Sequence, residues 1–271
     1  MLPLSGAEIA FVTTLLLAIG YAIGVWWGGT LVVLLLSRLR GPARGLAIVG
    51  TSGAAIGALA VLPFLRPLDD VTGVLLGFGA AVVVWGWLEL LLLQGVAVGT
   101  RRAPSAPGLK GLARFREAFD AIRHHEFALA GILVLVGVLS LGSALPVAFV
   151  TFALLWGLRL STKLHLFLGV PQPNGHLFPE GAAHLAAFLG PARRSPQLGL
   201  TTCVWALATI ALFSAGMMAP SSANATAWFL AGTLTGLGTL EHLTLLLPLR
   251  LESLWGWEKQ RLPSKGQPIQ G

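Results

Sequence analysis

The stretch VTGVLLGFGAAVVVWGWLELLLLQG, residues 71–95, contains a single charged residue, Glu89. A helix needs about 20 predominantly apolar residues to cross the hydrocarbon core of a bilayer. The stretch exceeds this length, so it predicts a transmembrane helix. It also predicts that Glu89 lies inside the membrane, where an ionisable side chain is costly and therefore a candidate functional residue.

The composition of the whole chain agrees with this local pattern. Of the 271 residues, 55% are hydrophobic and only 11% are charged, and the mean hydropathy is +0.79. A soluble domain carries about a quarter charged residues, so a soluble fold would leave too much apolar surface in water. The one cysteine, Cys203, excludes an intrachain disulfide and a cysteine-based zinc or iron–sulfur site.

Further apolar segments predict an all-α, polytopic integral membrane protein with about seven transmembrane helices. The predicted spans are residues 9–37, 45–65, 71–95, 126–143, 146–168, 198–219 and 225–249. They form one transmembrane helical domain over residues 1–258. The two long connections, 100–124 and 169–197, are predicted cytoplasmic loops, and residues 259–271 are a predicted flexible basic tail.

The basic residues predict the orientation of this domain. With the N-terminus outside and the C-terminus inside, all 18 Lys and Arg residues except Arg66 fall on the inner side. This asymmetry is typical of cytoplasmic loops. The net charge of +7 is therefore explained by orientation and by anionic lipid head groups, and it does not indicate nucleic-acid binding.

The connection 100–124 carries its own pattern. Leu109, Leu112, Phe115, Phe119 and Ile122 recur at helical spacing with basic residues between them. We expect a basic amphipathic helix in the inner membrane interface that leads into the fourth span.

Six ionisable residues lie within the spans or at their inner ends, and each is a candidate site residue. They are Glu89, Glu126, Arg159, Lys163, Glu241 and His242. Three interpretations stay open. One is a structural ion-pair network that fixes helix register, and another is an inward-opening polar pocket that binds a head group, a pigment or a partner. A proton or ion path is a third, although the outer halves of the spans offer no acid or base. Trp85, Trp87 and Trp156 are predicted aromatic walls of the pocket.

His242 has two interpretations of its own. An imidazole in a membrane helix can ligate a metal or the magnesium of a chlorophyll, and Gly238, one turn earlier, would leave room for a flat ring. Alternatively, His242 is hydrogen-bonded within the polar cluster. The sequence contains no metalloprotease, di-iron, P-loop, dinucleotide or nucleophile-elbow motif, so no catalytic or metal-binding residue is predicted.

The stretch STKLHLFLGVPQPNGHLFPEGAAHL, residues 161–185, divides at its prolines. Pro171 and Pro173 are expected to end the fifth helix, which leaves STKL in the polar cluster and the remainder in a docking loop. A short interfacial helix is expected there, with Glu180 and His184 one turn apart. Two ligands are too few for a metal site.

Glycines recur at four-residue spacing in two spans, and this spacing allows helices to pack closely. Gly20, Gly24 and Gly28 form the first set, and Gly232 and Gly236 form the second. Either set can pack within the bundle or against the helix of a partner.

Several strings together resemble a known family over residues 70–258. They are VVWGWLELLLLQG, TRRAPSAPGLKG, HHEFALA, LLWGLRLSTKLHLFLGVP and LEHLTLLLPLRLESLWGW, in this order. They resemble the PuhE family of photosynthetic complex assembly proteins, multi-span membrane proteins of phototrophic bacteria that are typically encoded near the reaction-centre H subunit. The chain departs from the family pattern at Leu88 (His in the family), His165 (Asn), the pair Gly175 and His176 (acids), and Leu243 and Thr244 (Trp and Phe).

The resemblance implies a divergent, non-enzymatic assembly factor for the reaction centre and core light-harvesting complex, or a modulator of bacteriochlorophyll supply. It implies the bacterial inner (intracytoplasmic) membrane as location. The implied partners are membrane lipids and either reaction-centre and core-antenna subunits or pigment-biosynthesis proteins, and bacteriochlorophyll or a precursor is a candidate ligand. The alternative is a membrane enzyme or carrier that acts on a pigment or lipid precursor.

Overall fold

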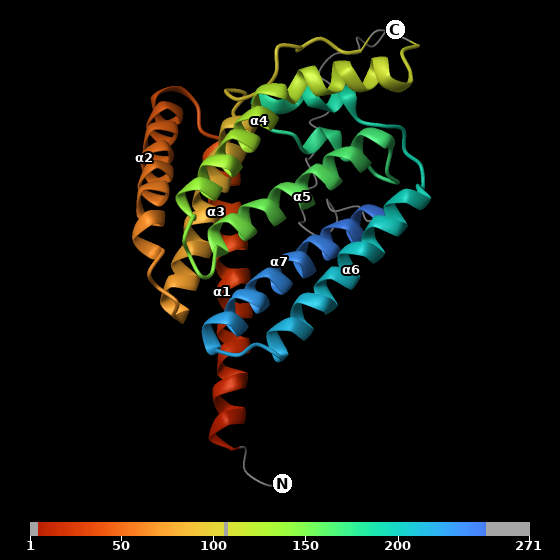
Figure 1. Cartoon of the computed structure of the whole chain (residues 1–271). Coiled ribbons are helices and arrows are strands. Elements are labelled where there is room, and N and C mark those ends of the chain that lie inside the picture. The colour runs from red at the N-terminus through yellow and green to blue at the C-terminus, as the bar shows by residue number, and fades with distance from the viewer. Residues whose placement is uncertain (1–4, 106–107, 248–271) are drawn as a thin grey trace, which may run out of the picture.

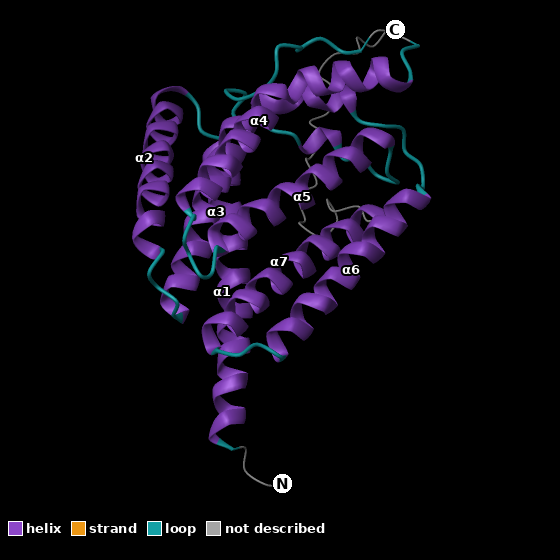
Figure 2. Cartoon of the chain, in the orientation of Figure 1, coloured by secondary structure: helices purple, strands orange, loops and turns teal. Residues whose placement is uncertain are grey.

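The computed structural model describes residues 5–105 and 108–247 (Figure 1). These residues form helices and loops and contain no strand (Figure 2). The long helices are α1 (Gly6–Ser37), α2 (Gly41–Leu65), α3 (Val71–Leu93), α4 (Gly111–Leu139), α5 (Val147–Leu168), α6 (Pro196–Met217) and α7 (Ser222–Leu246). Two short 3-10 helices, η1 (Gly175–Leu177) and η2 (Glu180–Phe188), lie between α5 and α6. The predicted tail, 259–271, lies outside the described residues.

The predicted membrane fold is confirmed. Six helices, α1 to α6, are long and apolar enough to cross a membrane, which makes the chain a multi-pass membrane protein. The predicted seventh span corresponds to α7, a 25-residue helix of lower hydropathy. Threonines account for part of this difference, and the hydroxyls of Thr226, Thr233 and Thr239 donate to carbonyls one turn earlier. The last two residues of the predicted span, 248–249, are not described.

The bundle is built around α3, with α7 beside it. In the most apolar 18-residue segment of α3, 61% of the residues are buried. The corresponding share is 11% in α1, α2 and α6, so those three helices present most of their surface outward. α6 and α7 lie side by side and antiparallel, and α1 runs along both α3 and α7 (Figure 1). α5 packs on α3 and α7, and α2 packs on α3 from the outside.

The amphipathic helix expected within the connection 100–124 is present, and it is continuous with the fourth predicted span. Residues 111–124 form the first half of α4, and the helix continues without a break to Leu139. The physical reason is the composition of the junction: residues 112–130 contain neither proline nor glycine, so nothing separates the expected amphipathic helix from the fourth span.

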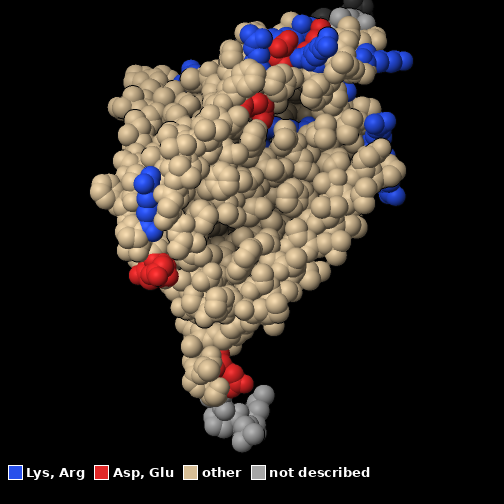
Figure 3. All heavy atoms as spheres, viewed as in Figure 1, with Lys and Arg blue, Asp and Glu red and all other residues tan. Residues whose placement is uncertain are grey.

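On the face shown in Figure 3, most Lys and Arg residues gather at one end of the bundle, and the middle of this face is nearly bare of charge. Two ion pairs lie there, one between two of the predicted inner connections and one within the connection 100–124. Arg40 lies 2.6 Å from Glu180, and Arg101 lies 3.1 Å from Glu117. Arg66, the exception in the sequence pattern, is at the opposite end of α2, where it donates to a carbonyl at the end of α4. The charge asymmetry predicted from the sequence is therefore present in the fold.

The two glycine sets have different surroundings. Gly232 and Gly236 face side chains of α6, so they serve packing within the bundle. Gly20, Gly24 and Gly28 are exposed on α1, and a Cβ added at any of them would meet no atom within 4 Å. The α1 set is not used by the described part of the bundle.

Candidate functional site

All six predicted site residues lie in the half of the bundle nearer its basic end. They come from four helices, α3, α4, α5 and α7. Their side chains form three groups, named after Arg159, Lys163 and His242.

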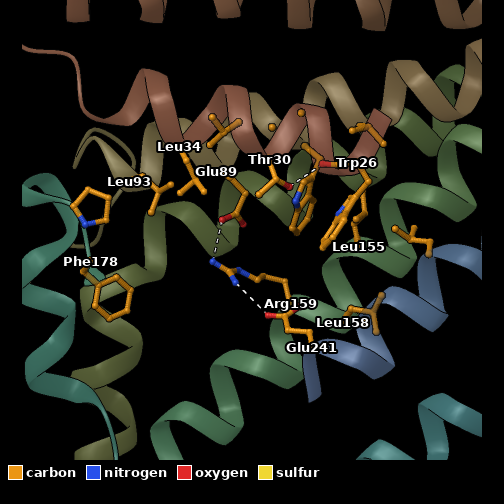
Figure 4. Close-up of a pocket in the computed structure, with 18 of the residues that line it drawn as sticks. Trp26, Thr30, Leu34, Glu89, Leu93, Leu155, Leu158, Arg159, Phe178 and Glu241 are labelled. Atoms are coloured by element: carbon orange, nitrogen blue, oxygen red, sulfur yellow. Dashed lines mark hydrogen bonds and ion pairs between the residues drawn. The ribbon is translucent and has the colours of Figure 1, made fainter. Parts of the chain in front are cut away.

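The Arg159 group bridges three helices. Arg159 of α5 donates from Nη2 to Oε2 of Glu89 on α3 at 3.3 Å, and its Nη1 lies 3.7 Å from Oε1 of Glu241 on α7 (Figure 4). The second distance exceeds hydrogen-bond range. Among the described residues, the Glu241 carboxylate therefore has this one long ion pair and no hydrogen bond.

The Lys163 group joins α4 to α5. Lys163 Nζ lies 2.7 Å from Oε1 of Glu126, and the indole of Trp156 donates to Oε2 of the same carboxylate at 3.1 Å. Both oxygens of Glu126 are satisfied, and only 7% of its side chain is exposed. A buried pair with complete hydrogen bonding is the arrangement in which a charge is tolerated away from water.

A residue outside the predicted set lies between these groups. His125 is fully buried, and its Nε2 lies 3.6 Å from Oε1 of Glu89. Within the described part of the chain, neither ring nitrogen has a hydrogen-bond partner. The sequence signal for His125 was its position directly before Glu126 in HHEF. Neighbouring residues on a helix point about 100° apart, so the side chains of His125 and Glu126 approach different helices.

The His242 group resolves the two interpretations of that residue. Its Nε2 is 2.8 Å from Oγ of Ser161, and its Nδ1 is 2.8 Å from the carbonyl oxygen of Gly238. The room predicted over Gly238 is filled, because a Cβ there would clash with the side chain of Leu158. His242 is fully buried and packs edge-on against His165, which sequence reasoning had not selected. The hydrogen-bonded interpretation is the one that the structure shows.

The three tryptophans predicted to form aromatic walls do not all lie at the same place. Trp156 bonds Glu126, as described, and Trp85 packs edge-on against Phe152 with ring centroids 5.5 Å apart. Trp87 lies away from the charged groups: its indole donates to Oγ of Ser52 on α2 at 2.9 Å. Two of the three tryptophans therefore adjoin the site, and the third joins α3 to the outer helix.

A cavity of about 380 Å³ opens beside the Arg159 group. It is enclosed by α1, α3, α5, α7 and the segment 174–179, and its polar lining includes Glu89, Arg159 and Glu241. The contribution of α1 was not predicted, because that helix carries no charge in its inner half and its sequence resembles a lipid-facing span. The residues of α1 that sequence reasoning missed are Trp26, Gly29, Thr30, Val33 and Leu34.

The predicted docking loop closes one end of this cavity. Phe178 and Pro179 line the cavity, and Arg114 donates hydrogen bonds to three carbonyls at the ends of α5 and η2. The expected short helix is present, with 3-10 geometry, in η2. Glu180 points outward to Arg40. The loop is thus packed onto the bundle and only part of it faces outward.

Comparisons with known proteins give the family. Residues 12–265 match the model of a family described as "Protein of unknown function (DUF3623)". The chain is also similar to a protein of Rhodobacter capsulatus described as an uncharacterized 30.4 kDa protein in the puhA 5' region. The two are 33% identical over 250 residues, which cover 91% of this chain and 90% of the relative. No solved structure matches. The chain therefore belongs to the DUF3623 family.

Proposed function

We propose that this protein is a non-enzymatic assembly factor for the bacterial photosynthetic reaction centre and core light-harvesting complex, located in the inner (intracytoplasmic) membrane. The observation that carries the proposal is the relative from the puhA 5' region, which is similar over nearly the whole chain. The strings that resemble the PuhE family support the same role.

The shape of the bundle supports a lateral mode of action. α1, α2 and α6 present most of their apolar surface outward, and the exposed glycine set of α1 offers a surface that another helix can approach closely. In the proposed mechanism, a reaction-centre or core-antenna subunit contacts these faces within the membrane. The basic end contacts peripheral partners such as pigment-biosynthesis proteins.

Deletion of the gene tests the proposal. We expect lower near-infrared absorbance of the assembled reaction centre and core antenna, with unchanged respiratory growth. Complementation with Gly24→Leu should restore absorbance poorly, whereas Gly131→Leu, at an exposed glycine of α4 with the same open surroundings, should restore it fully. Unaltered near-infrared spectra in the deletion strain would contradict the assembly role.

The cavity with its buried charges favours a second candidate, a membrane enzyme or carrier acting on a pigment or lipid precursor, such as a bacteriochlorophyll precursor. This candidate predicts that turnover or transport collapses in Glu89→Gln or Glu241→Gln. If both variants fold and only complex assembly changes, the enzyme or carrier role fails.

A further inference from the structure

The charged lining of the cavity is unbalanced. Among the described residues, it includes two carboxylates, Glu89 and Glu241, and one cation, Arg159. The neighbouring pair of Lys163 and Glu126 is neutral as a unit and contributes no excess charge. With both carboxylates ionised, the lining carries one net negative charge at membrane depth, where unpaired charges are strongly disfavoured.

The excess charge is accessible at Glu241. Its side chain is 32% exposed, against 10% for Glu89, and the Arg159 guanidinium lies too far away to donate a hydrogen bond to it. Glu89 is held by Arg159, and its buried Oε1, which has no hydrogen bond among the described residues, lies 3.6 Å from Nε2 of His125. A ligand in the cavity would thus meet the Glu241 carboxylate, which has no hydrogen-bond donor among the described residues.

The remaining walls are apolar. Trp26 and Leu34 of α1, Leu93 of α3 and Leu155 of α5 line the cavity together with Phe178. Figure 4 shows Phe178 and Trp26 on opposite sides of the charged groups, so an apolar body can extend along the walls in either direction from Glu241. The cavity volume of about 380 Å³ is in the range of sites for small organic ligands.

We propose that this cavity binds an amphiphile whose head group is a protonated amine, with Glu241 as its acceptor and the walls of α1, α3 and α5 around its apolar part. The ammonium supplies both the missing positive charge and the missing donors. Single-chain amines and aminophospholipids both carry a protonated amine head group of this kind. The inference rests on the cavity itself and does not depend on the proposed assembly role.

Binding of matched amphiphiles to the purified full chain in neutral maltoside micelles tests the proposal. The probes share one brominated alkyl chain and differ only in the head group: ammonium, alcohol or carboxylate. Quenching of tryptophan fluorescence reports binding, and Trp26→Phe should remove part of the signal because this indole lines the cavity. We expect the ammonium probe to bind about tenfold more tightly than the alcohol, and the carboxylate probe to bind more weakly than both.

Two pairs of variants locate the site. Glu241→Gln should abolish the preference for ammonium over alcohol, whereas Glu180→Gln, the same change at an exposed residue, should keep it. Leu34→Trp should weaken all three probes by filling the cavity, whereas Leu31→Trp, at an exposed residue of α1 that does not line the cavity, should weaken none.

Equal affinity for the three head groups, or a preference for carboxylate, would overturn the proposal even if Glu241→Gln did not fold. Retention of the ammonium preference in folded Glu241→Gln would overturn it as well. A further arm with brominated phosphatidylethanolamine and phosphatidylglycerol identifies the source. Preference for the former supports an aminophospholipid, and binding of the single-chain ammonium alone supports a free amine. A deletion strain with unaltered near-infrared absorbance would refute the assembly role and would not affect the amphiphile-binding result.

Discussion

Lys163 of α5 and Glu126 of α4 form the shortest ion pair of the site, at 2.7 Å, and Trp156 satisfies the second oxygen of Glu126. The contrast with Glu241, whose one charged contact among the described residues is at 3.7 Å, divides the polar cluster. The Lys163 group fits the structural interpretation, in which ion pairs fix helix register. The Arg159 group borders the cavity and fits the pocket interpretation.

Removing one partner of the complete pair should be strongly destabilising. In Glu126→Gln, Lys163 keeps a buried charge without its counter-ion, and we expect a loss of about 3 kcal/mol in unfolding free energy. Thermal or denaturant unfolding in detergent, followed by circular dichroism, measures this. The double variant Glu126→Gln/Lys163→Met should recover part of the loss. If the double variant were no more stable than Glu126→Gln, the charges of Glu126 and Lys163 would not be coupled.

Ser161→Ala should leave a ring nitrogen of His242 without a partner. Because His242 is fully buried, water cannot replace the hydroxyl, and the expected loss is about 1–3 kcal/mol. Ser222→Ala is the control, since that residue lies exposed at the start of α7. A stability loss no larger than in the control would mean that the Ser161–His242 bond contributes nothing.

Glycine substitutions should distinguish packed from open helix faces. Gly238→Ala places a methyl group against Leu158 and should destabilise by about 1–3 kcal/mol. Gly24→Ala meets no atom and should be neutral or stabilising by up to about 1 kcal/mol, because alanine is the better helix former. Unfolding midpoints of the two variants in detergent check this, and the reverse order would contradict the α5–α7 packing.

Arg114 should hold the segment between α5 and α6 in place. Arg114→Met removes the hydrogen bonds to three carbonyls of that segment, so limited proteolysis within residues 170–195 should accelerate several-fold. Arg114→Lys should restore protection only in part, because an ammonium lacks the planar fork of a guanidinium. Arg116→Met, at an exposed position of the same helix, should digest like the unmodified protein.

The predicted orientation is testable with impermeant maleimide in a Cys203→Ser background. Cysteine at Asp69, beside Arg66, should react in intact spheroplasts, and cysteine at Glu180, at the basic end, should react only after the membrane is opened. The opposite labelling pattern would place the N-terminus inside.

Much of the candidate site was predictable because the membrane makes ionisable residues rare and costly. Glu89, Arg159 and Glu241 stand out in apolar spans. Successive spans cross the membrane in opposite directions, and this alternation predicted that the three side chains lie at a similar depth. His125 and His165 were harder to select, since histidine is common at helix ends and only the packing shows that both are buried.

The sequence alone determined that the chain is an all-α membrane protein with its basic residues at one end, since apolar length and charge position are properties of each segment by itself. Tertiary structure decided which carboxylate has a complete set of partners, that Leu158 fills the space over Gly238, and that α1, which carries no charge near the site, closes a cavity. These outcomes depend on how neighbouring helices are rotated and spaced. The shapes of many facing side chains set that arrangement together, so no single segment encodes it.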